Sequence, residues 1–140
     1  MATLVDSNVL IDVIEEELAW SERSAAALER VGAMGPVVIN PVIYAEVSVR
    51  YEDTDELDLD LPVDLFQREQ LPWPAAFLAG KAFAEYRQRG GRRRAPLPDF
   101  FIGAHAAVTG MRLLTRDANR YRTYFPTVEL IVPGASGAHS

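Results

Sequence analysis

Short apolar runs rich in β-branched residues alternate with helical segments, and this alternation limits the fold more than any other feature of the chain. The runs lie at residues 3–5, 36–39, 111–115 and 128–132, with a further edge strand or crossover expected at 69–73. Helices are expected between them, at residues 8–14, 19–31, 41–50, 75–89 and 99–108. A short helix or turn is expected at 119–125, and the acidic stretch 52–64 predicts a short helix or an irregular loop. Strands separated by helices pair in parallel, with helices over both faces of the sheet. We therefore predict an α/β domain with a mainly parallel sheet of four or five strands.

Four acidic residues stand where these elements are expected to meet: Asp6, Glu46, Asp99 and Asp117. Asp6 and Asp117 each follow a strand and precede a helix, which is where ligands bind in open α/β sheets. Taken alone, Asp6 is also explained as a helix-capping residue. The repetition of the placement favours one shared acidic site instead.

Two of these residues are expected to face inward from helices. Glu46 shares a helix face with Val42 and Val49, so its carboxylate needs a cation or a hydrogen-bond partner. Asp99 heads a face of small and apolar residues that suits close packing on the sheet. Asp99 in the first turn is also explained by favourable interaction with the helix dipole.

Carboxylates that meet at one site repel each other, by about 4 kcal/mol per pair at ~4 Å and an effective dielectric constant of ~20. Protonation or a bound cation relieves this repulsion. Oxygen ligands favour a hard divalent ion, so Mg²⁺ or Mn²⁺ fits better than Zn²⁺, and the chain has two histidines and no cysteine. Such an ion can activate a water for attack on phosphorus. The pattern thus indicates metal-assisted phosphodiester hydrolysis.

Composition and charge narrow the setting. The 140 residues suit one domain, expected at residues 1–133, with a flexible tail at 134–140 rich in Gly, Ala and Ser. The absence of cysteine, of a signal-peptide pattern and of a long apolar run favours a soluble cytoplasmic protein without a membrane partner.

Charge is divided unevenly between the two halves of the chain. Residues 1–70 hold 16 Asp and Glu against 4 Arg, a net −12, whereas residues 71–140 hold 4 against 9 Arg and 1 Lys, a net +6. Three consecutive arginines, Arg92, Arg93 and Arg94, stand in a Gly- and Pro-flanked loop beside the expected acidic site. This loop is either a solubilising surface or a phosphate-binding element.

Four segments in order resemble a PIN domain, and more narrowly a VapC-type toxin ribonuclease of a bacterial toxin–antitoxin system. They are Leu4-Val5-Asp6-Ser7-Asn8-Val9-Leu10, Ala45-Glu46, Leu97-Pro98-Asp99-Phe100-Phe101-Ile102-Gly103-Ala104-His105-Ala106 and Leu114-Thr115-Arg116-Asp117. The resemblance implies an α/β/α sandwich that cuts RNA with Mg²⁺ or Mn²⁺, forms a homodimer and is inhibited by a cognate VapB-type antitoxin.

The resemblance also implies roles for single residues. Asp6, Glu46, Asp99 and Asp117 would be the catalytic metal ligands, supported by the polar side chains of Asn8 and Thr115. Arg92 to Arg94 and Arg116 would contact RNA or antitoxin. Many relatives have Asn at the position of Asp117 and a further acidic residue shortly after it. Here the later stretch is Asn119-Arg120-Tyr121, so Asp117 would bind the metal directly or through water.

Several other polar and aromatic residues have simpler explanations. Asp12 is expected to cap a helix or face solvent, and His105 to be a packing histidine. Trp20 and Trp73 are candidates for stacking on RNA bases, with at least one of them expected in the core.

Two other functions account for part of the pattern. A phosphoacceptor receiver module has a similar layout but needs a lysine near the last strand, and Lys81 stands inside a predicted helix. A PIN-like RNA-binding or scaffold protein that has lost catalysis would typically have lost one of the four carboxylates.

Overall fold

The computed structural model describes residues 1–90 and 97–134, and in these residues it contains five strands and seven helices. The strands are β1 (Thr3–Val5), β2 (Val37–Ile39), β3 (Gln67–Arg68), β4 (Arg112–Leu114) and β5 (Leu130–Ile131). The helices are α1 (Ser7–Ile14), α2 (Ser21–Met34), α3 (Pro41–Ser48), α4 (Thr54–Asp60), α5 (Trp73–Gln88), α6 (Leu97–Thr109) and α7 (Ala118–Tyr124). The arginines of the basic loop, Arg92 to Arg94, lie outside the described residues, as does all but the first residue of the predicted tail.

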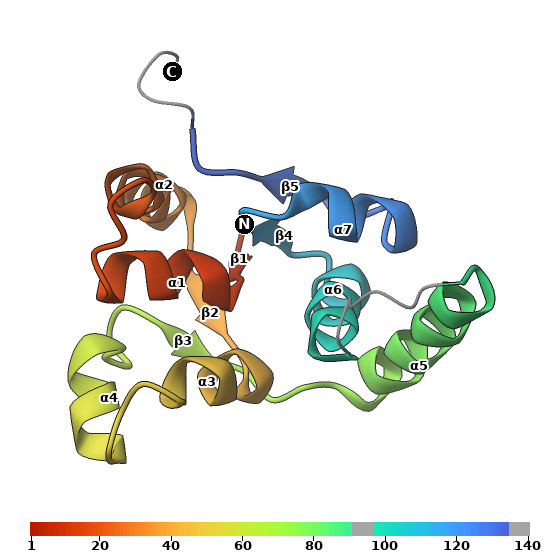
Figure 1. Ribbon diagram of the computed structural model, residues 1–140, viewed down its shortest axis with the longest axis horizontal. Coiled ribbons are helices and arrows are strands. Elements are labelled where there is room, and N and C mark those ends of the chain that lie inside the picture. Colours follow the sequence, from red (N-terminus) through yellow and green to blue (C-terminus); the bar gives the residue numbers. More distant parts are fainter. Residues whose placement is uncertain (91–96, 135–140) are drawn as a thin grey trace.

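All five strands are parallel and follow the order β3-β2-β1-β4-β5. Helices α1, α2 and α4 lie on one side of the sheet and α5, α6 and α7 on the other (Figure 1). The predicted α/β/α sandwich with a parallel sheet is therefore confirmed. The order also differs from the 2-1-3-4-5 order of receiver modules, which removes that alternative.

The chain reverses its direction of travel across the sheet between β3 and β4, so β1 and β4 flank the switch point. Ligands of open α/β sheets bind beyond the carboxyl ends of the strands at this point. Asp6 follows β1 and Thr115 follows β4 directly, so the topology alone brings these two residues together.

Local sequence explains most element boundaries. Asn40 caps α3, because its side-chain oxygen accepts a hydrogen bond of 2.9 Å from the Ile43 amide, and Pro41 occupies the first helical position. Asp53 caps α4 in the same way, with 2.9 Å to the Glu56 amide, which decides the open choice at residues 52–64 in favour of a helix.

The edge strand lies earlier than predicted. β3 pairs with β2 at Gln67 and Arg68, and the pairing continues only to the Glu69 amide, which donates to Ile39 O over 3.0 Å. The prediction of a strand at 69–73 was therefore wrong in position. Pro72 lacks an amide hydrogen and stands at the N-cap of α5, so the ladder cannot extend across it.

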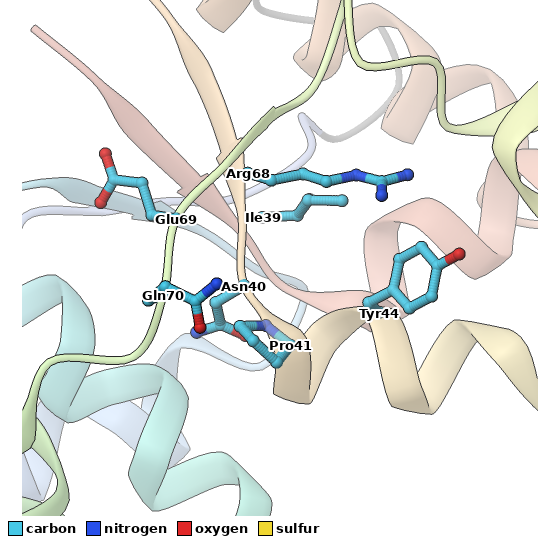
Figure 2. Close-up of a pocket in the computed structure, with 7 residues that line it drawn as sticks. All are labelled: Ile39, Asn40, Pro41, Tyr44, Arg68, Glu69 and Gln70. Carbon is cyan, nitrogen blue, oxygen red and sulfur yellow. The ribbon is translucent and has the colours of Figure 1, made fainter.

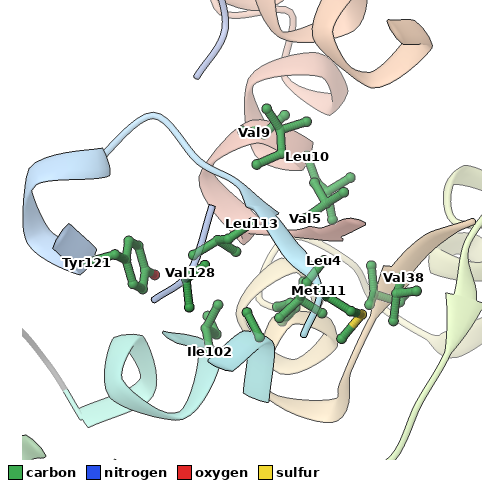
Figure 3. Close-up of a cluster of buried hydrophobic side chains, with 14 of the residues drawn as sticks. Leu4, Val5, Val9, Leu10, Val38, Ile102, Met111, Leu113, Tyr121 and Val128 are labelled. Atoms are coloured by element: carbon green, nitrogen blue, oxygen red, sulfur yellow. The ribbon is translucent and has the colours of Figure 1, made fainter. Parts of the chain in front are cut away.

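The core fills both faces of the sheet. Figure 3 shows Val9 and Leu10 of α1 on one side of the strands and Ile102 of α6 on the other. Gly103 of α6 permits a close approach of the two C-terminal helices, since a Cβ at this position would collide with the Phe125 ring. This packing seats Tyr121 of α7, which is 1% exposed, beneath the carboxyl end of β1.

Candidate active site

Asp6 is the most deeply placed of the four predicted carboxylates, with 3% of its surface exposed. It occupies the N-cap position of α1, but its side chain makes no capping hydrogen bond, so the helix-capping interpretation was wrong. Its Oδ2 atom instead accepts hydrogen bonds from Thr115 Oγ1 at 2.8 Å and from Tyr121 Oη at 2.9 Å. Three segments distant in sequence thus hold one carboxylate.

Burial raises the pKa of Asp6 from its ordinary value to about 6, although the hydrogen bonds from Thr115 and Tyr121 oppose the shift. The negative charges of Asp99 and Glu46 raise this pKa further. Burial and the same three carboxylates raise the pKa of Tyr121 well above 10, so its hydroxyl stays protonated and donates to Asp6.

Asp99 is the second buried carboxylate of the group, with 8% of its surface exposed in the first turn of α6. Burial raises its pKa, the Arg120 guanidinium opposes this shift, and the charges of Glu46 and Asp117 add to it. Arg120 Nη1 donates to Asp99 Oδ2 over 2.5 Å, and Arg120 Nη2 lies 3.5 Å from Asp117 Oδ2. The four predicted carboxylates therefore lie in one electrostatically coupled region.

Glu46 is half-buried on α3, and its Oε1 accepts a hydrogen bond of 2.6 Å from Ser7 Oγ. This bond supplies the partner that the Glu46 carboxylate was predicted to need. The predicted inward face of the helix was partly wrong, because Val49 is 80% exposed and the buried face of α3 carries Ile43 and Val47.

Thr115 links the first and last acidic segments. Its hydroxyl donates to Asp6 and accepts from the Asp117 amide at 2.9 Å, which orients both residues. Asn8 contacts this same hydroxyl through Nδ2 at 3.5 Å and accepts from the Arg116 amide at 3.3 Å. Asn8 thus supports Thr115 and the loop that follows it, and no direct bond from Asn8 to a carboxylate is described.

Asp12 differs from its expected role as a cap or solvent-facing residue. It is 2% exposed, and its carboxylate accepts from Ser24 Oγ at 2.8 Å and from Arg116 Nη1 at 2.7 Å. The Arg116 guanidinium also lies over the Trp20 ring, 4.2 Å from its centroid. Arg116, predicted to contact RNA or antitoxin, is therefore engaged within the protein.

The remaining predictions concern aromatic and histidine residues. His105 is fully buried, as expected for a packing histidine, and its Nδ1 lies 3.0 Å from Asn40 Nδ2. Burial lowers the pKa of His105. Trp73 is 88% exposed and Trp20 is half-buried, so the expectation that at least one tryptophan lies in the core was wrong.

Sequence reasoning missed Ser7, Asp12 and Tyr121 as parts of this region. Ser7 directly follows Asp6 in the sequence, but nothing in the sequence indicates that its hydroxyl binds Glu46, 39 positions away. Tyr121 follows Asp117 by four residues on a short helix. Its contact with Asp6 spans 115 positions, and only the packing of α7 on α6 brings the two together.

A separate pocket lies beyond the carboxyl end of β2, between α3 and the segment that follows β3 (Figure 2). Its volume is about 190 Å³, and its lining includes Tyr44, Arg68 and Glu69. Arg68 and Tyr44 both bind Asp58, at 2.7 and 2.9 Å. None of the predicted site residues lines this pocket.

The donor chemistry of the acidic region suits a hard divalent ion, because its charged groups are carboxylates, and burial together with the charges of Asp99 and Glu46 raises the pKa of Asp6. In the described part of the chain, however, no three Asp, Glu or His side chains are close enough together to hold one metal ion. The carboxylates are turned toward hydroxyl groups and Arg120 instead. A bound ion would require these carboxylates to turn toward one another.

Comparison with known proteins identifies the family. The PIN-domain profile matches residues 3–126, so the chain belongs to the PIN-domain family. A search of curated protein sequences gave no match.

Solved structures with the same fold come from toxin–antitoxin complexes. VapBC2 from Rickettsia felis, bound to a DNA fragment from its promoter, superposes with a TM-score of 0.72 at 17% identity, covering 94% of this chain and 98% of that one. VapBC-1 from nontypeable Haemophilus influenzae gives 0.69 at 15% identity over 93% and 96%. A toxin–antitoxin complex from Klebsiella pneumoniae gives 0.67 at 23% identity over 94% and 98%. At these identities the similarity establishes the fold.

Within the described residues, no helix has the length and apolarity needed to cross a membrane.

Proposed function

We propose that this protein is the toxin of a VapBC-type toxin–antitoxin system and hydrolyses RNA as a Mg²⁺- or Mn²⁺-dependent endoribonuclease. Membership of the PIN family and the likeness to structures of toxin–antitoxin complexes support this proposal. The observation that carries it is the burial of Asp6 at the switch point of the sheet, which raises its pKa to about 6, with the charges of Asp99 and Glu46 adding to the shift. Such an arrangement destabilises the empty site and favours a divalent cation.

Asp6, Glu46, Asp99 and Asp117 would hold the ion. When bound, the metal would supply an activated water and stabilise the negative charge that develops on the phosphate. The protein's own residues prepare the carboxylates for this role. Thr115 and Tyr121 fix the orientation of Asp6, and Ser7 fixes that of Glu46. These hydroxyl donors orient the carboxylates but, being neutral, do not neutralise the carboxylate charge that would attract the cation.

The partners follow from the same proposal. The substrate is RNA, the inhibitor is a cognate VapB-type antitoxin, the toxin is a homodimer, and the complex resides in the cytoplasm. The arginine-rich loop at 92–94 would contact RNA phosphates or the antitoxin.

The test is RNA cleavage by the purified protein with Mg²⁺ or Mn²⁺, compared with EDTA and with Asp99→Asn. Asp55→Asn, an exposed aspartate on α4, is the matched control. We expect cleavage with metal in the wild type and in the control, and none with EDTA or in Asp99→Asn. Cleavage by Asp99→Asn at the wild-type rate would refute the site.

Absence of cleavage by the wild type would favour a catalytically inactive PIN-like RNA-binding or scaffold protein. Calorimetry with Mn²⁺ separates this outcome from a nuclease of narrow RNA specificity, since only the nuclease would bind metal in a manner that depends on Asp99.

A further inference from the structure

Arg120 places a positive charge inside the acidic region, beside two of its four carboxylates. It lies on α7, and its guanidinium donates to Asp99 at 2.5 Å and lies 3.5 Å from Asp117. The partners described for Asp6 and Glu46 are neutral hydroxyl groups. Arg120 therefore supplies a charge that a divalent cation would otherwise supply to Asp99 and Asp117.

The Arg120 guanidinium and a metal ion would compete for the Asp99 carboxylate. The guanidinium remains protonated in proteins, so it cannot leave by losing its charge and must move. Its side chain is 38% exposed, which allows it to swing toward solvent. Arg116 provides a contrast within the same region, because Asp12 and the Trp20 ring hold it from two sides.

We propose that Arg120 is an exchangeable internal cation, which neutralises Asp99 and Asp117 in the metal-free protein and is displaced when a divalent ion binds. The proposal deepens the proposed function and rests on it. In the described residues no three acidic side chains come close enough to hold one ion, and the Arg120 contact occupies Oδ2 of Asp99. Arg120 thereby sets the metal affinity of the site, because binding the ion requires breaking this ion pair.

The test is the dissociation constant for Mn²⁺, measured by calorimetry on the full chain, in Arg120→Gln and in the control Arg122→Gln. Arg122 lies on the same helix but is exposed and bonded to Asn119. A partly exposed ion pair corresponds to a change of about 1.5-fold to fivefold in affinity. We expect Arg120→Gln to bind Mn²⁺ tighter by this factor, Arg122→Gln to match the wild type, and Arg120→Lys to lie between them.

A second readout is thermal stability. Arg120→Gln should melt below the wild type in EDTA, where the carboxylates lose their internal cation, and this difference should shrink at saturating Mn²⁺. A structural role alone would lower the melting temperature equally in both conditions.

Equal or weaker Mn²⁺ binding by Arg120→Gln would overturn the inference. If the wild type then still binds Mn²⁺ and Asp99→Asn does not, the proposed metal nuclease stands without it. Absence of Mn²⁺ binding in both the wild type and Arg120→Gln would overturn the inference and the proposed function together.

Discussion

Two buried aspartates, one at the N-cap of α1 and one within that helix, are bound by opposite kinds of partner. Asp6 and Asp12 are 3% and 2% exposed, and each is bound by one of two consecutive residues after β4. Thr115 donates a neutral hydroxyl to Asp6, whereas Arg116 brings a positive charge to Asp12. Ser24 completes the partners of Asp12.

The difference separates a carboxylate that stabilises the fold from the one that we propose binds metal. Asp12 has its countercharge within the protein, so it fastens α1 to α2 and to the loop after β4. Asp6 has neutral donors and further negative charges nearby, so its ionised form is costly until a cation arrives. Burial alone would not have distinguished the two.

The largest expected contrast is in RNA cleavage. Asp6→Asn should lower the cleavage rate by at least ~100-fold, because losing a ligand costs more than losing an outer partner of a metal site. Asp12→Asn should retain most of the activity, since its partners lie outside the metal site. Initial rates on one RNA substrate at saturating Mg²⁺ compare the two variants. Similar losses of cleavage rate in both variants would contradict the different roles of Asp6 and Asp12.

Stability should change with opposite signs in the same two variants. At pH 7.5 in EDTA, Asp6→Asn should raise the free energy of unfolding by about 3 kcal/mol, because it removes a buried charge whose pKa is raised from 3.8 to about 6. Asp12→Asn should lower it by about 2 kcal/mol, because it breaks the pair with Arg116. Urea denaturation measures both values, and a loss of stability in Asp6→Asn would contradict the argument.

The pH dependence of stability sharpens the same point. The pKa of Asp6 is about 6 in the folded protein and near 3.8 in the unfolded chain, so between these values the folded state binds more protons. The stability of the metal-free wild type should therefore fall relative to Asp6→Asn as pH rises from about 4 to 6, and the difference should be constant above about 7. Urea denaturation across this range tests the sign, and added Mg²⁺ at pH 7.5 should restore stability only in the wild type.

The smallest expected effect concerns Tyr121. Tyr121→Phe removes a hydrogen bond that lowers the pKa of Asp6, so that pKa should rise and Mn²⁺ binding should require a higher pH. The free energy of unfolding should change by about 1 kcal/mol. Tyr124→Phe, on the same helix, is the matched control, and equal pH profiles of Mn²⁺ binding in the two variants would argue against this role for Tyr121.

Much of the fold was predictable from local sequence. Apolar runs and the Asn40-Pro41 helix start act over a few residues, so they place elements without knowledge of the rest of the chain. The same logic placed Asp6 and Asp117 after strands, and parallel strands bring such residues to one edge. Helix α4 and strand β3 were less certain, because a seven-residue helix and a two-residue strand carry little pattern.

The sequence by itself determined that this chain forms a parallel α/β sheet with carboxylates at the ends of its strands, because short-range periodicity and strand direction suffice for that. Only the tertiary structure decided which charges are paired. Asp12 and Arg116, 104 positions apart, neutralise each other, while Asp6 remains among hydroxyls and Arg120 reaches Asp99. A carboxylate's pKa and partners depend on burial and on neighbours from distant segments, and no local pattern specifies these.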